Sequence, residues 1–249
     1  MPVNSDAYPV QEGPLVLLSN RPWNSSLAER LSQRLNRHVT RITKPSELRP
    51  EVIATKDPQW VFVTHWNNWI PKSIWGTWPT VIFHMTDLPY GRGGSPLQNL
   101  IKRKHRATKI TAILCDNGLD TGDIYLKEDL SLEGSAEEIF LRADKIIEHM
   151  IEEIVRTEPV PIPQVGTPEL FKRRTPSQSN IDTCPAGDVD AWYDHIRMLD
   201  ATGYPHAFLE ANGMRLELRR VSKRSDGLYA DVKIVPLSQG QTDHHNTDS

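Results

Sequence analysis

Short apolar runs recur through the first half of the chain, each closed by a polar residue, a proline or a glycine. They are LVLLSN from Leu15, HVTRIT from His38, WVFVTH from Trp60, TVIFHM from Thr80 and KITAILC from Lys109. A continuous apolar run of this length is typical of a strand buried on both faces, as in parallel sheets. Because parallel strands need crossover connections, the series predicts an α/β fold.

Two segments have helical periodicity. Leucines recur every four residues on one face of Ser25–Leu35, and isoleucines share one face of the longer segment Ser135–Arg156. The longer segment opens with SAEE, the pattern of a capping box. We therefore predict that residues 1–158 form an N-terminal domain, a Rossmann-like, mainly parallel sheet flanked by helices.

The chain changes character after Thr157. Five prolines lie within EPVPIPQVGTPELFKRRTP, which indicates an extended linker. Beyond it, VDAWYDHIRMLD predicts a short helix, and AFLEANGMRLELRR with LYADVKIVP predicts hairpin strands that turn at Asn212-Gly213. We expect a linker and a small, mostly β C-terminal extension over residues 159–237, and a disordered tail over residues 238–249.

Charge and cysteine content narrow the class of protein. The chain has 29 Lys and Arg against 32 Asp and Glu, a net charge of -3, so no overall basic field attracts nucleic acid or an anionic membrane. The start, MPVNSDAYPV, is neither basic nor followed by an apolar region, so we expect no signal sequence there, and no apolar run approaches the roughly 20 residues of a membrane span. Cys115 and Cys184 lack zinc-binding spacing and are expected as reduced thiols. We expect a cytoplasmic protein without a metal site.

The stretch HMTDLPYGRGGSPLQNLI, from His84 to Ile101, carries the clearest chemical signal. A strand ends at a histidine, and a Leu-Pro turn, a glycine-rich loop and an apolar helix follow. A histidine at the carboxyl end of a strand points into the crevice where open α/β sheets bind ligands. No G-x-G-x-x-G fingerprint and no Walker lysine motif is present, which argues against nicotinamide and ATP chemistry.

This stretch resembles the motif N-x-H-x-S-x-L-P-x-x-R-G-x-x-P of the folate-dependent formyltransferases, which include the methionyl-tRNA, glycinamide ribonucleotide and nucleotide-sugar enzymes. The matching offsets are occupied by His84, Thr86, Leu88-Pro89, Arg92-Gly93 and Pro96. The family's later D-x-G loop is matched by GLDTGD at residues 118–123. The resemblance covers residues 15–156, and the full stretch is most similar to bacterial enzymes that act on UDP-linked 4-amino sugars on the way to pseudaminic acid.

The resemblance implies formyl transfer from 10-formyltetrahydrofolate to an amine, with residues 1–158 as the catalytic domain. It assigns catalysis to His84 and to Asp120, which orients or charges the histidine. Histidine suits this chemistry because an imidazole can move the amine proton and stabilise charge on the formyl oxygen near neutral pH. Gly118 and Gly122, on either side of Leu119, would let this loop approach a flat pterin closely.

Ile82 departs from the family motif, which has an asparagine two residues before the histidine. The resemblance makes that asparagine a donor to the formyl oxygen, and loss of one such donor costs roughly two to three orders of magnitude in rate. Asn67, Asn68 and His65, in the loop after the preceding strand, are candidate replacement donors. The alternative is that these side chains solvate the loop or contact the sugar.

Five of the seven tryptophans lie within nineteen residues that begin at Trp60. This stretch aligns with the family loop that walls the folate pocket, where aromatic side chains can stack on planar rings. The resemblance therefore places Trp66, Trp69 and Pro71 beside the folate, whereas Trp60 and Trp75 are expected in the core.

Arg92, Gly93, Arg173 and Arg174 are candidates for binding the second substrate. Arg92, in the glycine-rich turn, either grips a phosphate or ties the loop to a carboxylate. Arg173 and Arg174, just beyond the prolines, either contact a nucleotide diphosphate or belong to a solvated face. A diphosphate on an anionic protein needs local positive charge, which keeps both as candidates.

The prediction is an N-formyltransferase whose substrate is a nucleotide-linked amino sugar, a UDP-linked 4-amino-4,6-dideoxy sugar of surface-glycan or pseudaminic acid synthesis. The alternatives are a methionyl-tRNA formyltransferase and a catalytically silent protein that binds folate or a nucleotide sugar. From Val160 onward the chain has 10 Lys or Arg and 12 Asp or Glu, a poor clamp for tRNA, so no nucleic-acid polymer is expected as partner. A membrane is not expected either, and a homodimer is left open.

Overall fold

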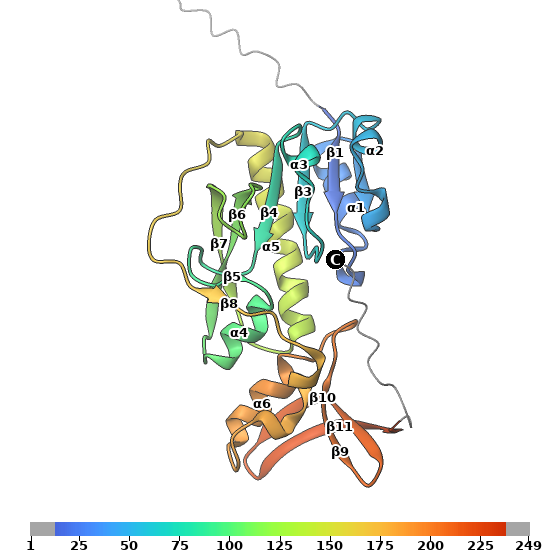
Figure 1. Cartoon of the computed structure of the whole chain (residues 1–249), viewed down its shortest axis with the longest axis vertical. Coiled ribbons are helices and arrows are strands. Elements are labelled where there is room, and N and C mark those ends of the chain that lie inside the picture. The colour runs from blue at the N-terminus through green and yellow to red at the C-terminus, as the bar shows by residue number, and fades with distance from the viewer. Residues whose placement is uncertain (1–12, 238–249) are drawn as a thin grey trace, which may run out of the picture.

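The computed structural model describes residues 13–237, and its centre is a six-stranded mixed sheet (Figure 1). In spatial order the strands are β2 (Val39–Ile42), β1 (Leu15–Leu18), β3 (Trp60–Thr64), β4 (Thr80–His84), β6 (Ala107–Leu114) and β7 (Ile124–Ser131). The first four are parallel to one another, and β6 and β7 are each antiparallel to the strand before them. The predicted Rossmann-like, mainly parallel sheet is confirmed.

Helices cover both faces of the parallel strands. Leu15 and Leu17 of β1 belong to a core shared with α1 (Leu27–Leu35) and α5 (Ala136–Thr157). Val16 and Leu18, which point to the opposite face, pack with α2 (Pro50–Ala54) and α3 (Lys72–Trp75). Burial on both faces explains why these strands are continuous apolar runs rather than alternating ones. Two short 3₁₀ turns, η1 (Pro22–Asn24) and η2 (Pro45–Glu47), complete the connections.

The long helix α5 begins with the predicted capping box. The Ser135 side chain accepts a hydrogen bond from the Glu138 N–H, and the Glu138 carboxylate accepts one from the Ser135 N–H. Further along, the buried carboxylates of Asp144 and Glu148 pair with Arg30 of α1 at 2.6 and 2.7 Å. These ion pairs fasten α5 to α1 on one face of the sheet.

The antiparallel half of the sheet differs from the sequence expectation. The segment KITAILC does form a central strand, β6, but the chain turns back after β4 through α4 (Pro96–Lys102) and enters β6 from the same end. An antiparallel neighbour needs no crossover helix. β7 was not predicted, because its sequence IYLKEDLS is half-buried at the sheet edge and mixes charged with apolar side chains.

The predicted linker is an extended segment that packs against the sheet domain, and we call residues 158–175 the strap. Ile162 bridges Ile124 at the start of β7, and β8 (Leu170–Phe171) pairs in parallel with β5 (Arg92–Gly93). Figure 1 shows the strap running around the β7 side of the sheet before it reaches the C-terminal region.

The C-terminal region is a helix packed on a three-stranded antiparallel sheet. Its elements are η3 (Pro176–Ser179), η4 (Ile181–Thr183), α6 (Val189–Arg197), β9 (Ala207–Ala211), β10 (Met214–Arg224) and β11 (Gly227–Pro236). Asn212 and Gly213 form the predicted tight turn, with positive φ angles of 50° and 72°. The tail expected at residues 238–249 lies outside the described residues. Within residues 13–237, no helix has the length and apolar character needed to cross a bilayer.

Candidate active site

His84 ends β4, and only 7% of its surface is exposed. Its Nε2 lies 2.8 Å from the carbonyl oxygen of Gly91. Since a carbonyl oxygen can only accept, Nε2 is the nitrogen that carries a proton. The Gly91 carbonyl also accepts from Thr86 Oγ1 at 3.3 Å, which fixes its direction. The other ring nitrogen, Nδ1, faces Asp120 Oδ2 at 3.5 Å.

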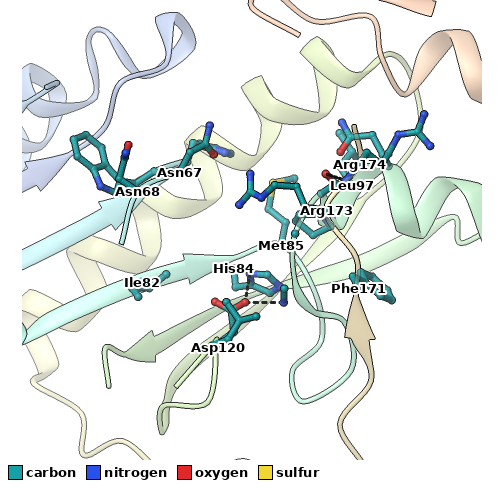
Figure 2. Close-up of a pocket in the computed structure, with 18 of the residues that line it drawn as sticks. Asn67, Asn68, Ile82, His84, Met85, Leu97, Asp120, Phe171, Arg173 and Arg174 are labelled. Carbon is teal, nitrogen blue, oxygen red and sulfur yellow. Dashed lines mark hydrogen bonds and ion pairs between the residues drawn. The ribbon is translucent and has the colours of Figure 1, made fainter. Parts of the chain in front are cut away.

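Asp120 lies in the loop between β6 and β7, with a left-handed φ of 53°. Asp116 shapes the start of this loop, because its carboxylate accepts from Gly118 N–H at 2.9 Å and from Thr121 Oγ1 at 2.8 Å. Asp120 Oδ2 also accepts from Gly93 N–H at 2.8 Å. The Asp120 carboxylate is thus fixed between a backbone N–H and the His84 imidazole (Figure 2), a preorganised arrangement of charge.

A cavity of about 570 Å³ opens beside this pair, at the carboxyl ends of β3 and β4. Its lining comes from the loops after β3 and β6, the glycine-rich turn, the strap and the segment 199–205. The sequence-predicted residues that line it are His65, Trp66, Asn67, Asn68, Trp69, His84, Gly93, Gly118, Leu119, Asp120, Arg173 and Arg174.

Pro71 and Gly122 lie outside the cavity walls, contrary to expectation. Pro71 precedes α3, and its carbonyl accepts from Ile74 N–H at 2.9 Å. At Gly122 an added Cβ would lie 1.7 Å from the carbonyl oxygen of Leu114. Packing within the loop, rather than approach to a ligand, therefore requires glycine at position 122.

Arg92 also lies outside the cavity walls. Its Nε and one terminal nitrogen donate to Gln164 Oε1 of the strap at 3.2 and 2.7 Å. Among the described residues the loop is therefore tied to an amide oxygen and not to a carboxylate, and a phosphate contact of Arg92 stays a prediction. Gly93 lines the cavity, and its φ of 105° together with the Phe171 carbonyl, 2.5 Å from where a Cβ would be, requires glycine there.

Ile82 lines the cavity on the same face of β4 as His84. Asn67 and Asn68 lie in the loop after β3, apart from His84 in Figure 2, and their side chains make no hydrogen bond to any described residue. Each amide is therefore available to a ligand. That one of them replaces the family asparagine stays a prediction.

His65 lines the cavity and also belongs to an aromatic cluster. Its ring packs edge-on against Trp23 and Phe140, with centroids 5.6 and 5.4 Å away, and its Nε2 is buried without a partner among residues 13–237. Burial, reinforced by the positive charge of Arg21, lowers the pKa of His65 to about 4. His65 is thus neutral at pH 7. That it donates to the formyl oxygen stays a prediction.

The cavity lining includes the aromatic side chains of Trp66 and Trp69 and the apolar side chain of Leu119. Trp69 is 62% exposed and Trp66 is half-buried, and Cys115 lies at the end of β6 beside them in the lining. Burial, with the carboxylates of Asp116 and Asp120, raises the pKa of the Cys115 thiol to about 12, so it remains protonated and unreactive. Such a lining suits a planar heterocycle. Trp60 is buried in the core as expected, and Trp75 packs against the core from a half-buried position.

Another part of the cavity lining carries positive charge. The guanidinium groups of Arg21 and Arg173 have no ion pair or hydrogen bond to any described residue. Arg174 donates to the carbonyl oxygen of Gln178 and has no carboxylate partner among residues 13–237. Burial lowers the pKa of Arg174, which is the cost of holding a guanidinium in this wall.

Three residues in and around the cavity were missed from the sequence. Arg21 follows the first strand, and the rule that strand ends meet at one edge of a sheet could have marked it. Tyr204, which stacks on Phe140 with centroids 5.3 Å apart and lies under Arg21, comes from the C-terminal region. Gln164 lies in a proline-rich segment that gives no sequence signal for a buried polar contact.

The fold and this cavity define a Rossmann-like transferase, and comparisons give its family. A family model described as "Methionyl-tRNA formyltransferase, C-terminal domain" matches residues 176–235. A solved structure of a methionyl-tRNA formyltransferase from Clostridium thermocellum is 44% identical, with a TM-score of 0.87 over 90% of this chain and 99% of that chain. The chain belongs to the formyltransferase family, which confirms that part of the resemblance. The nearer likeness to nucleotide-sugar enzymes is not supported by these matches.

Two further relatives bear on length and cofactor. A methionyl-tRNA formyltransferase of Nitratiruptor sp. is 29% identical over 220 residues, and the match covers 79% of this chain but only 66% of that relative's length. HypX from Aquifex aeolicus, solved in complex with tetrahydrofolic acid, shares the fold at 16% identity, with a TM-score of 0.70 over 91% of this chain and 46% of HypX. The family uses 10-formyltetrahydrofolate as its formyl donor.

Proposed function

We propose that this chain transfers the formyl group of 10-formyltetrahydrofolate to a primary amine on an acceptor that carries phosphate. The observation that carries the proposal is the His84–Asp120 pair, which lies at a ligand-sized cavity in a chain 44% identical to a solved formyltransferase. The apolar side chains of Trp66, Trp69 and Leu119 would hold the pterin, and the bound folate supplies an activated formyl group.

His84 is the catalytic base of this proposal. Its Nε2 is engaged by Gly91, so Nδ1 is the nitrogen left to take the proton that the amine loses. The Asp120 carboxylate, 3.5 Å from Nδ1, stabilises the imidazolium that results. Asn67 or Asn68 would donate to the formyl oxygen in place of the family asparagine, since Ile82 cannot.

Methionyl-tRNA is the first candidate acceptor. The family model, the Nitratiruptor relative and the Clostridium thermocellum structure all carry that name. Arg21, Arg173 and Arg174 would contact phosphates near the aminoacyl end, because unpaired guanidinium groups bind phosphate oxygens well.

A nucleotide-linked amino sugar is the second candidate, and the distribution of charge favours it. On the C-terminal sheet, Arg215 pairs with Glu210 at 2.6 Å, and Arg219 and Lys233 pair with Glu217 at 3.3 and 3.5 Å. Cations already held by carboxylates contribute little to an extended RNA interface. Arg21 and Arg173, which have no carboxylate partner among residues 13–237, both line the cavity, where a compact diphosphate would fit.

One assay separates the two acceptors. Purified protein is incubated with 10-formyltetrahydrofolate and either methionyl-tRNA or a panel of UDP- and TDP-linked amino sugars, and N-formyl products are measured by mass spectrometry. Acceptor binding is followed against salt, because contacts to many phosphates give a steep slope and contacts to one diphosphate a shallow one. The His84→Asn variant serves as the control. Absence of formyl product with every acceptor would refute the proposed activity.

A further inference from the structure

Gln164 is an inward-facing residue in an otherwise exposed part of the strap. Its neighbours Ile162, Val165 and Leu170 are 63%, 86% and 67% exposed, although all three are apolar. Gln164 itself is half-buried. A polar side chain thus faces the sheet domain while apolar neighbours face solvent. Because burying a polar group costs free energy, this arrangement requires hydrogen bonds to the buried amide.

Every hydrogen-bonding position of the Gln164 amide is used. Nε2 donates to the carbonyl oxygens of Asp120 and Gly122 at 2.9 and 2.8 Å. Oε1 accepts from Arg92 Nε and from a terminal nitrogen of Arg92 at 3.2 and 2.7 Å. One side chain therefore joins the loop that carries Asp120 to the turn that carries Gly93.

The two segments joined by Gln164 are the ones that hold the Asp120 carboxylate. Gly93 N–H donates to Asp120 Oδ2 at 2.8 Å, and the same oxygen faces His84 Nδ1. Asp120 has a left-handed φ of 53°, a conformation that costs a non-glycine residue energy unless its surroundings hold it. The bonds from Gln164 to the carbonyls on either side of Thr121 provide that hold.

We propose that Gln164 is a positioning residue for formyl transfer, which sets the direction of the Asp120 carboxylate toward His84 with Arg92 as its anchor. The inference rests on the proposed function and adds to it a residue outside the cavity. Arg92 has no carboxylate partner among residues 13–237, so its guanidinium serves the Gln164 amide. The backbone of the strap assists, because the Glu169 carbonyl accepts from both Gly91 N–H and Arg92 N–H at 3.1 and 2.9 Å.

The first test is kinetic. Gln164→Ala and Gln164→Glu should each lower kcat about tenfold and leave both KM values within twofold, because a displaced carboxylate weakens the reaction step and not substrate binding. The glutamate variant would retain the side-chain length and the bond to Arg92 but cannot donate to two carbonyls, so it keeps the test valid if the alanine variant unfolds. Val165→Ala, at an exposed neighbouring position, is the matched control and should leave kcat unchanged.

A double-mutant cycle separates positioning from general stability. In an Asp120→Ala background, Gln164→Glu should cost no further activity, since the group it positions has been removed. An equal loss in both backgrounds, an unchanged kcat in both Gln164 variants, or a rise in KM alone would each overturn the inference.

A spectroscopic readout keeps the inference separate from the activity. The ¹⁵N signals of the His84 ring, assigned by their loss in His84→Asn, should move in Gln164→Glu in the direction seen in Asp120→Asn and stay in place in Val165→Ala. Unmoved His84 signals in Gln164→Glu overturn the inference even if the enzyme is active. If no acceptor is formylated but the His84 signals move as expected, the proposed function fails and the positioning of Asp120 by Gln164 stands.

Discussion

Two groups of residues in and around the cavity are held in opposite ways. In the catalytic group, the Asp120 carboxylate and its neighbours are all partnered, from His84 and Gly93 to Gln164 and Arg92. In the arginine group, Arg21 and Arg173 line the cavity with no carboxylate to neutralise them among residues 13–237.

This difference separates preorganisation from recognition. A satisfied network holds its groups in place before substrate arrives, which favours the reaction step. Unpaired guanidinium groups gain their partners only when an anion binds, so they favour affinity and the choice of acceptor. Substitutions in the catalytic group should therefore change kcat, and substitutions in the arginine group should change the KM for the acceptor.

The largest effect on activity is expected from substitutions in the catalytic group. His84→Asn and Asp120→Ala should each lower kcat at least about a hundredfold, because they remove the proton acceptor or the charge that stabilises it. KM for both substrates should change little. Steady-state kinetics test this, with circular dichroism as the folding control, and near-normal turnover in either variant would contradict the assignment of both residues.

A pH effect on stability is expected from His65, which lies near Arg21 of the arginine group. The pKa of His65 is about 4 in the folded protein and near 6.5 in the unfolded chain, so only the unfolded chain takes up this proton between those values. The contribution is fully present above pH 6.5 and is lost as pH falls toward 4, by up to roughly 3 kcal/mol.

Urea unfolding at pH 7.5 and 4.5 measures this loss in wild type and in His65→Asn. Asparagine tolerates the left-handed φ of 51° and does not titrate in this range. The variant should lose less stability than wild type between the two pH values. An identical loss in both proteins would show that His65 is not held neutral.

A smaller, salt-dependent effect on affinity is expected from the free arginines. Arg21→Ala and Arg173→Ala should each raise the KM for the acceptor about tenfold, the scale of one charge-assisted hydrogen bond, with kcat within threefold. The increase should shrink at high salt. A fall in kcat with unchanged KM would instead show that these arginines act in the reaction step, and would contradict the contrast between the two groups.

Ile82→Asn should change kcat less than threefold, because Asn67 and Asn68 already line the cavity with unpaired amides. The half-buried asparagine would lower the melting temperature by a few degrees, since its amide gains no partner on the apolar face of β4. Thermal denaturation and kinetics measure both effects. A rise in kcat above tenfold would show that the oxyanion donor is missing in the natural chain.

The smallest effect is expected on the C-terminal sheet. Arg215→Ala removes a cation that is already paired with Glu210, so acceptor KM should stay within twofold and stability within about 1 kcal/mol. A clear loss of affinity for methionyl-tRNA in this variant would extend the phosphate-binding surface from the cavity to the sheet and favour the tRNA acceptor.

The strands that are buried on both faces could be predicted from the sequence. β1, β3 and β4 are apolar along most of their length because helices cover both faces, and the α5 capping box depends on two residues three positions apart. β7 escaped prediction because one edge of the sheet relaxes the need for apolar side chains. The local pattern of apolar residues thus indicates how deeply a strand is buried. A strand at the edge of the sheet is only partly buried, so its pattern is weaker.

The candidate site was predictable where a short motif holds it. His84, Asp120 and the tryptophan loop belong to contiguous segments, and the structure brings them to one cavity. The contact of Arg92 with Gln164 was not predicted, because Gln164 is 72 residues away and depends on the path of the strap. Such long-range pairing follows from tertiary structure, which no local pattern in one sequence encodes.

The path of the strap limits how this protein can be divided and recombined. The strap supplies Gln164 to the catalytic loop and Arg173 to the cavity lining. A chimaera joined directly after α5 would exchange both at once, and a fragment that stops there would keep its sheet but lose part of its cavity lining. To exchange acceptor preference between relatives without changing the catalytic loop, the junction of a chimaera has to lie after Gln164 and before Arg173. The junction can precede or follow β8, which pairs with β5.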